Sequence, residues 1–416
     1  MFSTRSLPRL DATRTLAENG SSRLDFAGHL PVATMVDVDN TNAFDFSSSE
    51  FLSPATISRL QSMGYPLGLI AQLGKAKAAY PIRFWIVDNS SSMEELDGEV
   101  LLEHHDSSVA PRVVACTRWQ ELQSTVHYQA GLAGLLSTNT TFRLLNGASS
   151  WTVADPNDMT QSSTDSSVRR LQSGIQAARP QGCTPLTEQL RQIYQQIQGP
   201  VAQRLRSENQ RAVVVLATDG LPSDAAGRTN HIVTTQFLES LRTLQALPVW
   251  IVIRLCTDTP EVVEFYSNLD RKYELPLDVL DDVRSEAKEV QEHNPWLNYT
   301  LPLHRFREMG CHCRLLDMLD ERPLAKDQMF RFLGLLLGEN VLDTAPSMHT
   351  EWKQFLAFVQ PRVHALGKAW NPSADQMEYW IDMKQLEDCY GPASKSKQAR
   401  LFFARRKNKS KKIYAC

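Results

Sequence analysis

The sequence predicts an α/β fold, a doubly wound, mostly parallel sheet flanked by helices in the Rossmann-like manner. From residue 81 onward, short β-type runs alternate with longer helical patterns, as expected for parallel strands joined by crossover helices. Two of these runs, Phe84 to Val87 and Val213 to Leu216, are continuously apolar, which is typical of strands covered on both faces. The chain has 416 residues, 42% of them hydrophobic and 22% charged, so it can bury a full core.

The first 80 residues divide into two parts. Residues 1–50 mix Ser, Thr, Asp and Asn with few spaced apolar residues, a composition that predicts a disordered leader. Residues 51–80 form an amphipathic helical segment in this interpretation, because apolar residues from Pro54 to Ala79 recur every three to four positions. The pattern fits one helix or a pair broken near Gly64 to Pro66.

Residues 81–340 are predicted to form the sheet domain. The expected strands are Ile82–Val87, Arg112–Cys116, Thr141–Leu145, Ala212–Ala217 and Val249–Leu255. The expected helices between them are Arg118–Leu136, Ser166–Ala178, Leu186–Gln198 and Ile232–Gln245. Residues 259–340 are expected to be mostly helical, including the acidic segment Asp278 to Glu292.

Two further segments follow the predicted domain. Residues 341–393 carry aromatic residues such as Trp352 and Tyr379 and are expected to form a helical extension. Residues 394–416 hold nine Lys or Arg and no acid, and this basic tail is expected to be solvated. The tail is a candidate contact for nucleic acid or for an anionic surface, as well as a nuclear address or a solubilising segment.

Charge and cysteine content narrow the function class. With 44 Lys or Arg and 47 Asp or Glu, the net charge of −3 argues against a globally basic nucleic-acid-binding surface. Seven scattered cysteines and no apolar leader indicate reduced thiols and an intracellular protein, cytoplasmic or nuclear. The longest apolar runs fall far short of about 20 residues, so no transmembrane segment is expected.

Five oxygen-bearing side chains lie on loops of the predicted sheet domain. Asp88, Ser90 and Ser92 form a D-x-S-x-S pattern after the first strand, Thr184 precedes a helix, and Asp219 follows the strand Ala212 to Ala217. Ligands bind open α/β sheets at the carboxyl ends of their strands, where these groups can converge. Hydroxyl and carboxylate oxygens are ligands that suit Mg²⁺ or Mn²⁺.

This set resembles the metal-ion-dependent adhesion site (MIDAS) of the von Willebrand factor type A (VWA) domain. The resemblance covers about Pro81 to Gly338 and implies a VWA fold in which Asp88, Ser90, Ser92, Thr184 and Asp219 hold the metal ion. It also implies that an acidic side chain of a partner protein completes the coordination. This sequence departs from the family at Ser91 and Cys183, where the family often has Gly.

The donor chemistry favours binding over catalysis. Three neutral hydroxyls and two carboxylates leave a six-coordinate Mg²⁺ short of protein ligands, so an outside carboxylate can complete its shell. No adjacent His or Glu is placed as a base, and no nucleophile motif is present. We therefore expect a non-enzymatic, metal-dependent protein-binding module whose partner supplies an Asp or Glu. The alternative is a phosphatase-like, metal-dependent hydrolase that uses the same open position.

Two weaker signals point to other chemistry. Asp37-Val38-Asp39-Asn40-Thr41 matches the D-x-D-x-T signature of haloacid dehalogenase phosphatases, but its acidic partner pair, Asp281-Asp282, is expected inside a helix. A zinc site would need Cys and His ligands at suitable spacing. The candidate ligands for such a site are His304, Cys311, His312 and Cys313. They lack a second C-x-x-C half.

Overall fold

The computed structural model describes residues 52–102, 111–157, 163–273 and 277–392. The predicted leader of residues 1–50 and the basic tail of residues 394–416 lie outside this range, as does the D-x-D-x-T match at Asp37 to Thr41. Side chains are described for the same residues except 102 and 270–273.

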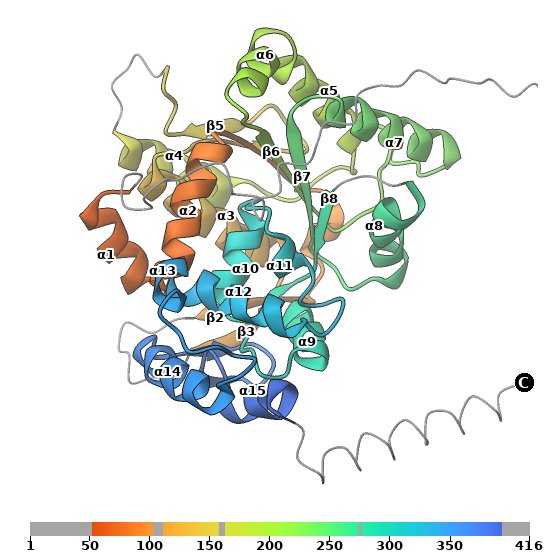
Figure 1. The fold of residues 1–416 in the computed structure, drawn as a ribbon. Helices are drawn as coiled ribbons and strands as arrows, with labels where there is room; N and C mark the ends of the chain where they lie inside the picture. The colour runs from red at the N-terminus through yellow and green to blue at the C-terminus, as the bar shows by residue number, and fades with distance from the viewer. Residues whose placement is uncertain (1–51, 103–110, 158–162, 274–276, 393–416) are drawn as a thin grey trace, which may run out of the picture. The chain divides into compact units, whose positions relative to one another are not determined.

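A six-stranded sheet organises the fold, with strand order β5-β4-β1-β6-β7-β8 (Figure 1). Every neighbouring pair is parallel except β4 with the edge strand β5. The strands are β1 (Ile82–Val87), β4 (Asn139–Leu144), β5 (Ser150–Val153), β6 (Ala212–Thr218), β7 (Val249–Leu255) and β8 (Leu277–Leu280). The α/β class and the mostly parallel sheet are thus as predicted.

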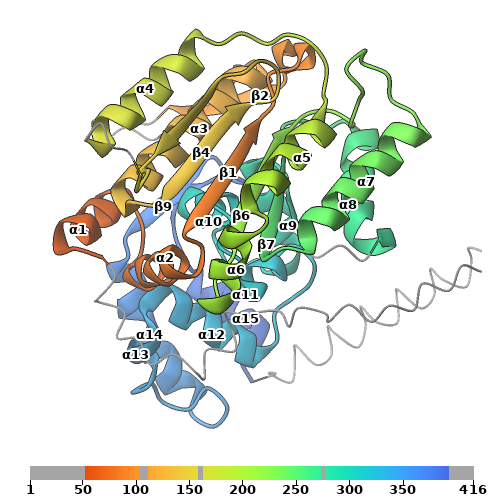
Figure 2. The same cartoon turned by 90° about the horizontal axis from the view of Figure 1, so that it is seen from above.

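The central strands are covered on both faces. On β1, Phe84 and Ile86 belong to one hydrophobic cluster, whereas Trp85 and Val87 belong to the other, as the two-residue period of a strand requires. All seven residues of β6 are buried, which explains its uninterrupted apolar sequence. Figure 2 shows β6 between β1 and β7, in the middle of the sheet.

Helices supply both clusters. The Phe84 face is covered by α5 (Leu186–Ile197), α6 (Pro200–Ser207), α7 (His231–Gln245) and α8 (Pro260–Tyr273). The cluster of the Trp85 face draws on α1 (Pro54–Ser62), α2 (Leu67–Ala79), α3 (Arg118–Leu136), α4 (Thr164–Ala177), α9 (Val283–His293), α10 (Leu301–Glu308), α11 (Arg314–Asp317), α12 (Lys326–Leu337), α13 (Glu339–Leu342), α14 (Trp352–Ala365) and α15 (Met383–Tyr390). The helices α1 and α2 confirm that the amphipathic segment is a broken pair.

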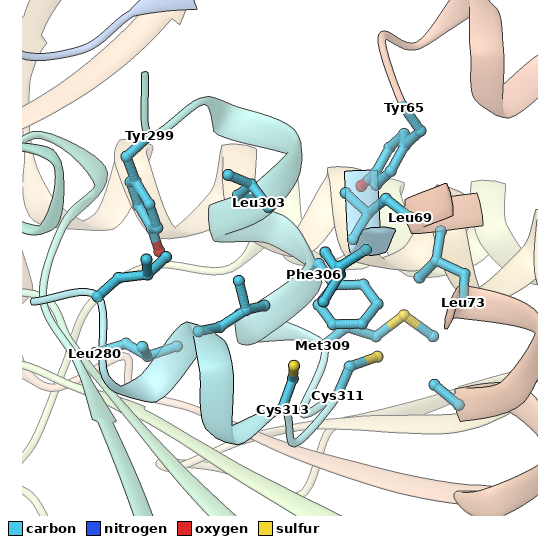
Figure 3. Close-up of a cluster of buried hydrophobic side chains, with 14 of the residues drawn as sticks. Tyr65, Leu69, Leu73, Leu280, Tyr299, Leu303, Phe306, Met309, Cys311 and Cys313 are labelled. Carbon is cyan, nitrogen blue, oxygen red and sulfur yellow. The ribbon is translucent and has the colours of Figure 1, made fainter. Parts of the chain in front are cut away.

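The short helix α10 lies inside the second cluster. Leu303 and Phe306 are buried on it, and Figure 3 shows Phe306 pointing toward Leu69 and Leu73 of α2. The segment before β1 therefore joins the core of the sheet domain instead of standing apart from it. Among the described residues, no helix is long and apolar enough to cross a membrane.

One predicted strand has a different partner. Arg112–Cys116 is a strand, β3, but it pairs antiparallel with β2 (Gly98–Leu102) in a separate hairpin instead of joining the parallel sheet. Its residues are partly or largely exposed. The expectation that it belongs to the main sheet was wrong, and β5 occupies the sheet edge instead.

The acidic segment Asp278 to Glu292 is not wholly helical. It begins within the sixth sheet strand, β8, and the helix α9 starts only at Val283. Asp281 and Asp282 therefore follow a strand directly, and Asp282 caps α9 by accepting hydrogen bonds from two backbone N–H groups. The expected position of this pair inside a helix was wrong, because a four-residue strand is too short to stand out beside the helical pattern.

The C-terminal segment also contains an unexpected hairpin. Between α14 and α15, the strands β9 (Lys368–Asn371) and β10 (Gln376–Tyr379) pair antiparallel. The prediction of a purely helical extension over 341–393 was wrong at this point. Met377 and Tyr379 are spaced two residues apart, which fits a strand better than a helix.

Candidate functional site

The two predicted carboxylates meet at the carboxyl edge of the sheet. Asp88 follows β1 and Asp219 follows β6, and these strands are parallel neighbours in which Val87 is in register with Ala217. The pairing continues one step further, because the backbone N–H of Asp88 donates to the carbonyl of Ala217 at 3.0 Å. Sheet register therefore fixes how the two aspartates approach each other.

Asp88 is completely buried and is held by two neighbours. Its carboxylate accepts hydrogen bonds from the backbone N–H of Ser90 at 2.8 Å and from the hydroxyl of Thr218 at 2.6 Å. Burial, reinforced by the nearby charge of Asp219, nevertheless raises the pKa of Asp88 from 3.8 to about 6. The site thus carries a negative charge that the surrounding protein does not fully neutralise.

Three oxygens form a tight triangle above the sheet edge. The hydroxyls of Ser90 and Ser92 lie 3.1 Å apart, and both donate to Oδ1 of Asp219, at 3.4 Å and 2.9 Å respectively. The two serines lie at the start of a 3-10 helix, Ser91–Glu94, which turns both hydroxyls toward the same point. Ser90 is buried, whereas Ser92 is exposed, so the triangle is reached from the side of Ser92.

Thr184 approaches the same region from a third loop. Its backbone is paired with Ser223, which accepts from the N–H of Thr184 at 2.8 Å and returns a hydrogen bond to its carbonyl at 2.9 Å. A Cβ atom added to Gly220 would lie only 3.1 Å from the Thr184 hydroxyl. Thr184 is therefore beside the residue that follows Asp219, and a side chain at position 220 would crowd it.

The loops are tied together by asparagine side chains. Asn89 exchanges hydrogen bonds with the backbone of Asn146, at 3.1 Å and 2.7 Å, and Asn146 donates in turn to the carbonyl of Cys183 at 2.7 Å. Cys183 itself donates through its thiol to the carbonyl of Asp224 at 3.4 Å. The residue that departs from the family pattern thus anchors the loop that carries Thr184.

A guanidinium that sequence reasoning missed contacts the site. Arg118, the first residue of α3, donates to Oδ2 of Asp219 at 2.9 Å and to both oxygens of Asp97 at 2.6 Å. Asp219 is fully shielded from solvent in this pair, whereas Asp97 is half exposed. No sequence pattern links Arg118 with a residue 101 positions away, although its place at a helix start near the sheet edge was predictable.

The residues of the zinc alternative have other contacts. His304 lies 3.2 Å from buried Glu308 on the same helix, and the ring of His312 lies against that of Trp250, with centroids 4.1 Å apart and the planes tilted by 41°. The remaining two candidates, Cys311 and Cys313, are buried in the core cluster. Within the described ranges, no group of three or more His, Cys, Asp or Glu side chains is arranged to hold a metal ion.

The five predicted side chains therefore differ in how closely they converge. Ser90, Ser92 and Asp219 are in direct contact, Asp88 is linked to them through the backbone of Ser90, and Thr184 lies beside Gly220. Their donor set consists of two carboxylates and three hydroxyls, a combination suited to a hard divalent cation.

No protein-family model matches this chain, and no curated protein matches it either.

Proposed function

We propose that this chain is a metal-dependent protein-binding module of the VWA type. In this proposal Asp88, Ser90, Ser92 and Thr184 hold Mg²⁺ or Mn²⁺, and Asp219 tunes the charge of the ion while contributing one oxygen to its shell. An acidic side chain of a partner protein completes the coordination. The ion supplies a strong local positive charge, and the chain's own residues fix its position and leave one side open.

The spacing of the oxygen triangle carries the proposal. In an octahedral shell with bonds of about 2.1 Å, neighbouring oxygens lie about 3.0 Å apart. The three oxygens of Ser90, Ser92 and Asp219 are separated by 2.9, 3.1 and 3.4 Å. This spacing fits one triangular face of such a shell, with small movements needed at the longest edge.

Local charge also supports a cation. Asp88, Asp97 and Asp219 contribute three negative charges and Arg118 one positive charge, so the group carries −3 + 1 = −2 when fully ionised. The raised pKa of Asp88 reflects burial and this repulsion. A divalent cation would balance the group and lower that pKa, because an opposite charge favours the carboxylate.

A carboxylate on a protein partner fits the open side of the site better than a small free anion does. Leu96 is 79% exposed on the segment between Ser92 and Asp97, where it offers an apolar contact beside the site. A partner that inserts a carboxylate can cover this side chain at the same time. Burial of a leucine contributes about 1.5–3 kcal/mol, enough to make the interaction depend on more than the ion.

The test is thermal unfolding of the full chain with EDTA or with Mg²⁺ or Mn²⁺. At 100 times its dissociation constant, an ion that binds only the native state stabilises it by about 2.7 kcal/mol. We expect a rise in melting temperature for the unaltered chain, and none for Asp88→Ala or Ser90→Ala. Ser91→Ala is the matched control, because Ser91 is exposed and is not one of the proposed ligands.

Partner capture provides the second measurement. Proteins recovered from cell extract with Mg²⁺ should be lost with EDTA and with Asp88→Ala, and retained with Ser91→Ala. The proposal would be refuted by two results together. The melting temperature would not change at millimolar Mg²⁺ or Mn²⁺, and the same proteins would be recovered with and without EDTA. Turnover of phosphoesters that disappears in Asp88→Ala would instead favour the hydrolase alternative.

A further inference from the structure

Arg118 connects the candidate metal site to the surface loop beside it. Its Nη1 donates to Oδ2 of Asp219 at 2.9 Å, while its Nε and Nη2 donate to the two oxygens of Asp97, both at 2.6 Å. The side chain of Asp219 is shielded from solvent, whereas that of Asp97 is 53% exposed. One guanidinium therefore bridges a buried carboxylate of the site and a carboxylate that water reaches.

The guanidinium is held by more hydrogen bonds at Asp97 than at Asp219. Two parallel bonds join Arg118 to Asp97, the bidentate geometry that makes strong arginine–carboxylate pairs, and one longer bond joins it to Asp219. In agreement, the hydrogen bonds to Asp97 are the main reason why the pKa of Arg118 is raised above its ordinary value. Loss of the bond to Asp219 would therefore leave the guanidinium held by Asp97.

The backbone around Asp97 is fixed against the start of α3. The N–H of Arg118 donates to the carbonyl of Glu95 at 3.0 Å. A Cβ atom added to Gly98 would lie 2.7 Å from the carbonyl oxygen of Thr117, so the two backbones are in direct contact there. Asp97 lies between these two contacts, which keep its carboxylate within reach of Arg118.

The other oxygen of Asp219 belongs to the triangle that would hold the ion. Oδ1 accepts from the hydroxyls of Ser90 and Ser92, and in the proposed site the ion binds all three oxygens. Because Oδ1 and Oδ2 belong to one carboxylate, an ion at Oδ1 and the guanidinium at Oδ2 are neighbours of like charge, and they repel each other. The single negative charge of Asp219 must then serve both cations.

From this geometry we infer that Arg118 competes with the ion for Asp219, and that Asp97 retains the guanidinium when the ion binds. The inference rests on the proposed metal site and concerns the regulation of that site. Without the ion, Arg118 balances the charge of Asp219. With the ion bound, Asp97 balances the charge of Arg118. Ion affinity therefore depends on a carboxylate that is not itself a ligand and that lies beside the exposed Leu96.

The test is calorimetric titration of the full chain with Mn²⁺, which measures ion affinity directly. Arg118→Met should bind Mn²⁺ at least about tenfold more tightly, because the competing charge is removed. Asp97→Asn should bind at least about fivefold more weakly, because Arg118 then keeps its bond to Asp219. When Arg118→Met is already present, Asp97→Asn should change the affinity less than about twofold, because Asp97 acts through Arg118.

Glu99→Gln is the matched control. Glu99 is 46% exposed and pairs with Arg284 at 2.8 Å, so this variant also removes one half-exposed carboxylate from an arginine pair. Its affinity for Mn²⁺ should stay within about twofold of that of the unaltered chain. The melting temperature in EDTA reports separately on folding. If Arg118→Met does not fold, the comparison of Asp97→Asn with Glu99→Gln still tests the inference.

Three results would overturn the inference while Mn²⁺ still binds. The first is an affinity that Arg118→Met lowers or leaves unchanged. The second is an equal effect of Asp97→Asn with and without Arg118→Met, which would mean that Asp97 acts on the ion directly through its charge. The third is an equal effect of Asp97→Asn and Glu99→Gln. Failure of Mn²⁺ to bind the unaltered chain and every variant would instead refute the proposed metal site, and the inference with it.

Discussion

Replacement of Asp88 by Asn should stabilise the ion-free protein at neutral pH. Asp88 is completely buried, and its pKa of about 6 replaces an ordinary value of 3.8, a difference of about 2.2. At ~1.4 kcal/mol per pH unit, ionisation of this carboxyl costs the folded state roughly 3 kcal/mol. The amide of Asn is neutral and avoids this cost, while it can still accept from the backbone of Ser90.

The sign of the pH dependence follows from the direction of the shift. Because the folded-state pKa lies above the unfolded one, the native state binds more protons between pH 3.8 and about 6. The cost of ionisation is therefore absent below this window and complete above it. The advantage of Asp88→Asn should shrink by about 2 kcal/mol between pH 7.5 and pH 4.5.

Urea unfolding followed by tryptophan fluorescence, in EDTA, measures both free energies at each pH. Use of the difference between the two proteins cancels the titration of carboxyls distant from Asp88, since these are common to both. An advantage that stays the same at pH 7.5 and pH 4.5, or a variant less stable than the unaltered chain at pH 7.5, would refute this reasoning. Mg²⁺ should then stabilise the unaltered chain and leave the Asn variant unchanged.

Three other substitutions test the core and the site by the same urea measurement. Gly310→Ala should cost about 3 kcal/mol, because Gly310 has φ +82° and a Cβ there would lie 2.3 Å from Val213; a loss within experimental error would contradict this close contact. Glu308→Gln should cost about 3 kcal/mol, because it removes the buried charge that pairs with Arg305 at 2.7 Å and with Arg254 at 3.4 Å, and unchanged stability would show that these pairs contribute nothing. Arg118→Met should cost about 3 kcal/mol in EDTA, because the buried carboxylate of Asp219 loses the guanidinium that pairs with it. The stabilisation by Mg²⁺ should increase, because the ion then balances this charge; a smaller Mg²⁺ effect would show that the arginine assists the ion.

The parts of the fold that the sequence predicted are those with strong local signals. β1 and α3 have the predicted bounds. The apolar run Phe84 to Val87 in β1 is followed at once by Asp88 and Asn89, and α3 begins with a capping box formed by Thr117 and Gln120. β8 was missed because its four residues include Asp278, which breaks the apolar run. Propensity within such a short segment is weaker than the pairing with β7 that the tertiary fold provides.

The candidate site was predictable to a similar extent. The sequence placed Asp88 and Asp219 at the carboxyl ends of strands of one parallel sheet, where their loops share an edge. That β1 and β6 are direct neighbours follows from the sheet topology and not from the order of the strands in the chain. The role of Arg118 was not predictable, since its contacts depend on how α3 approaches the sheet edge. The pairing of Asp97 with the same guanidinium depends on the β2–β3 hairpin, whose separate position no local pattern indicated.

The complete burial of β6 has a consequence for the rate at which its backbone amides exchange with solvent. Backbone amides of this strand are expected to exchange with solvent deuterium only when the whole domain unfolds, because β6 is paired with a strand on each side and is covered on both faces. Asp219 directly follows this strand, whereas Thr184 belongs to a loop outside the sheet. A cation bound by both would slow exchange in the loop far more than in the strand.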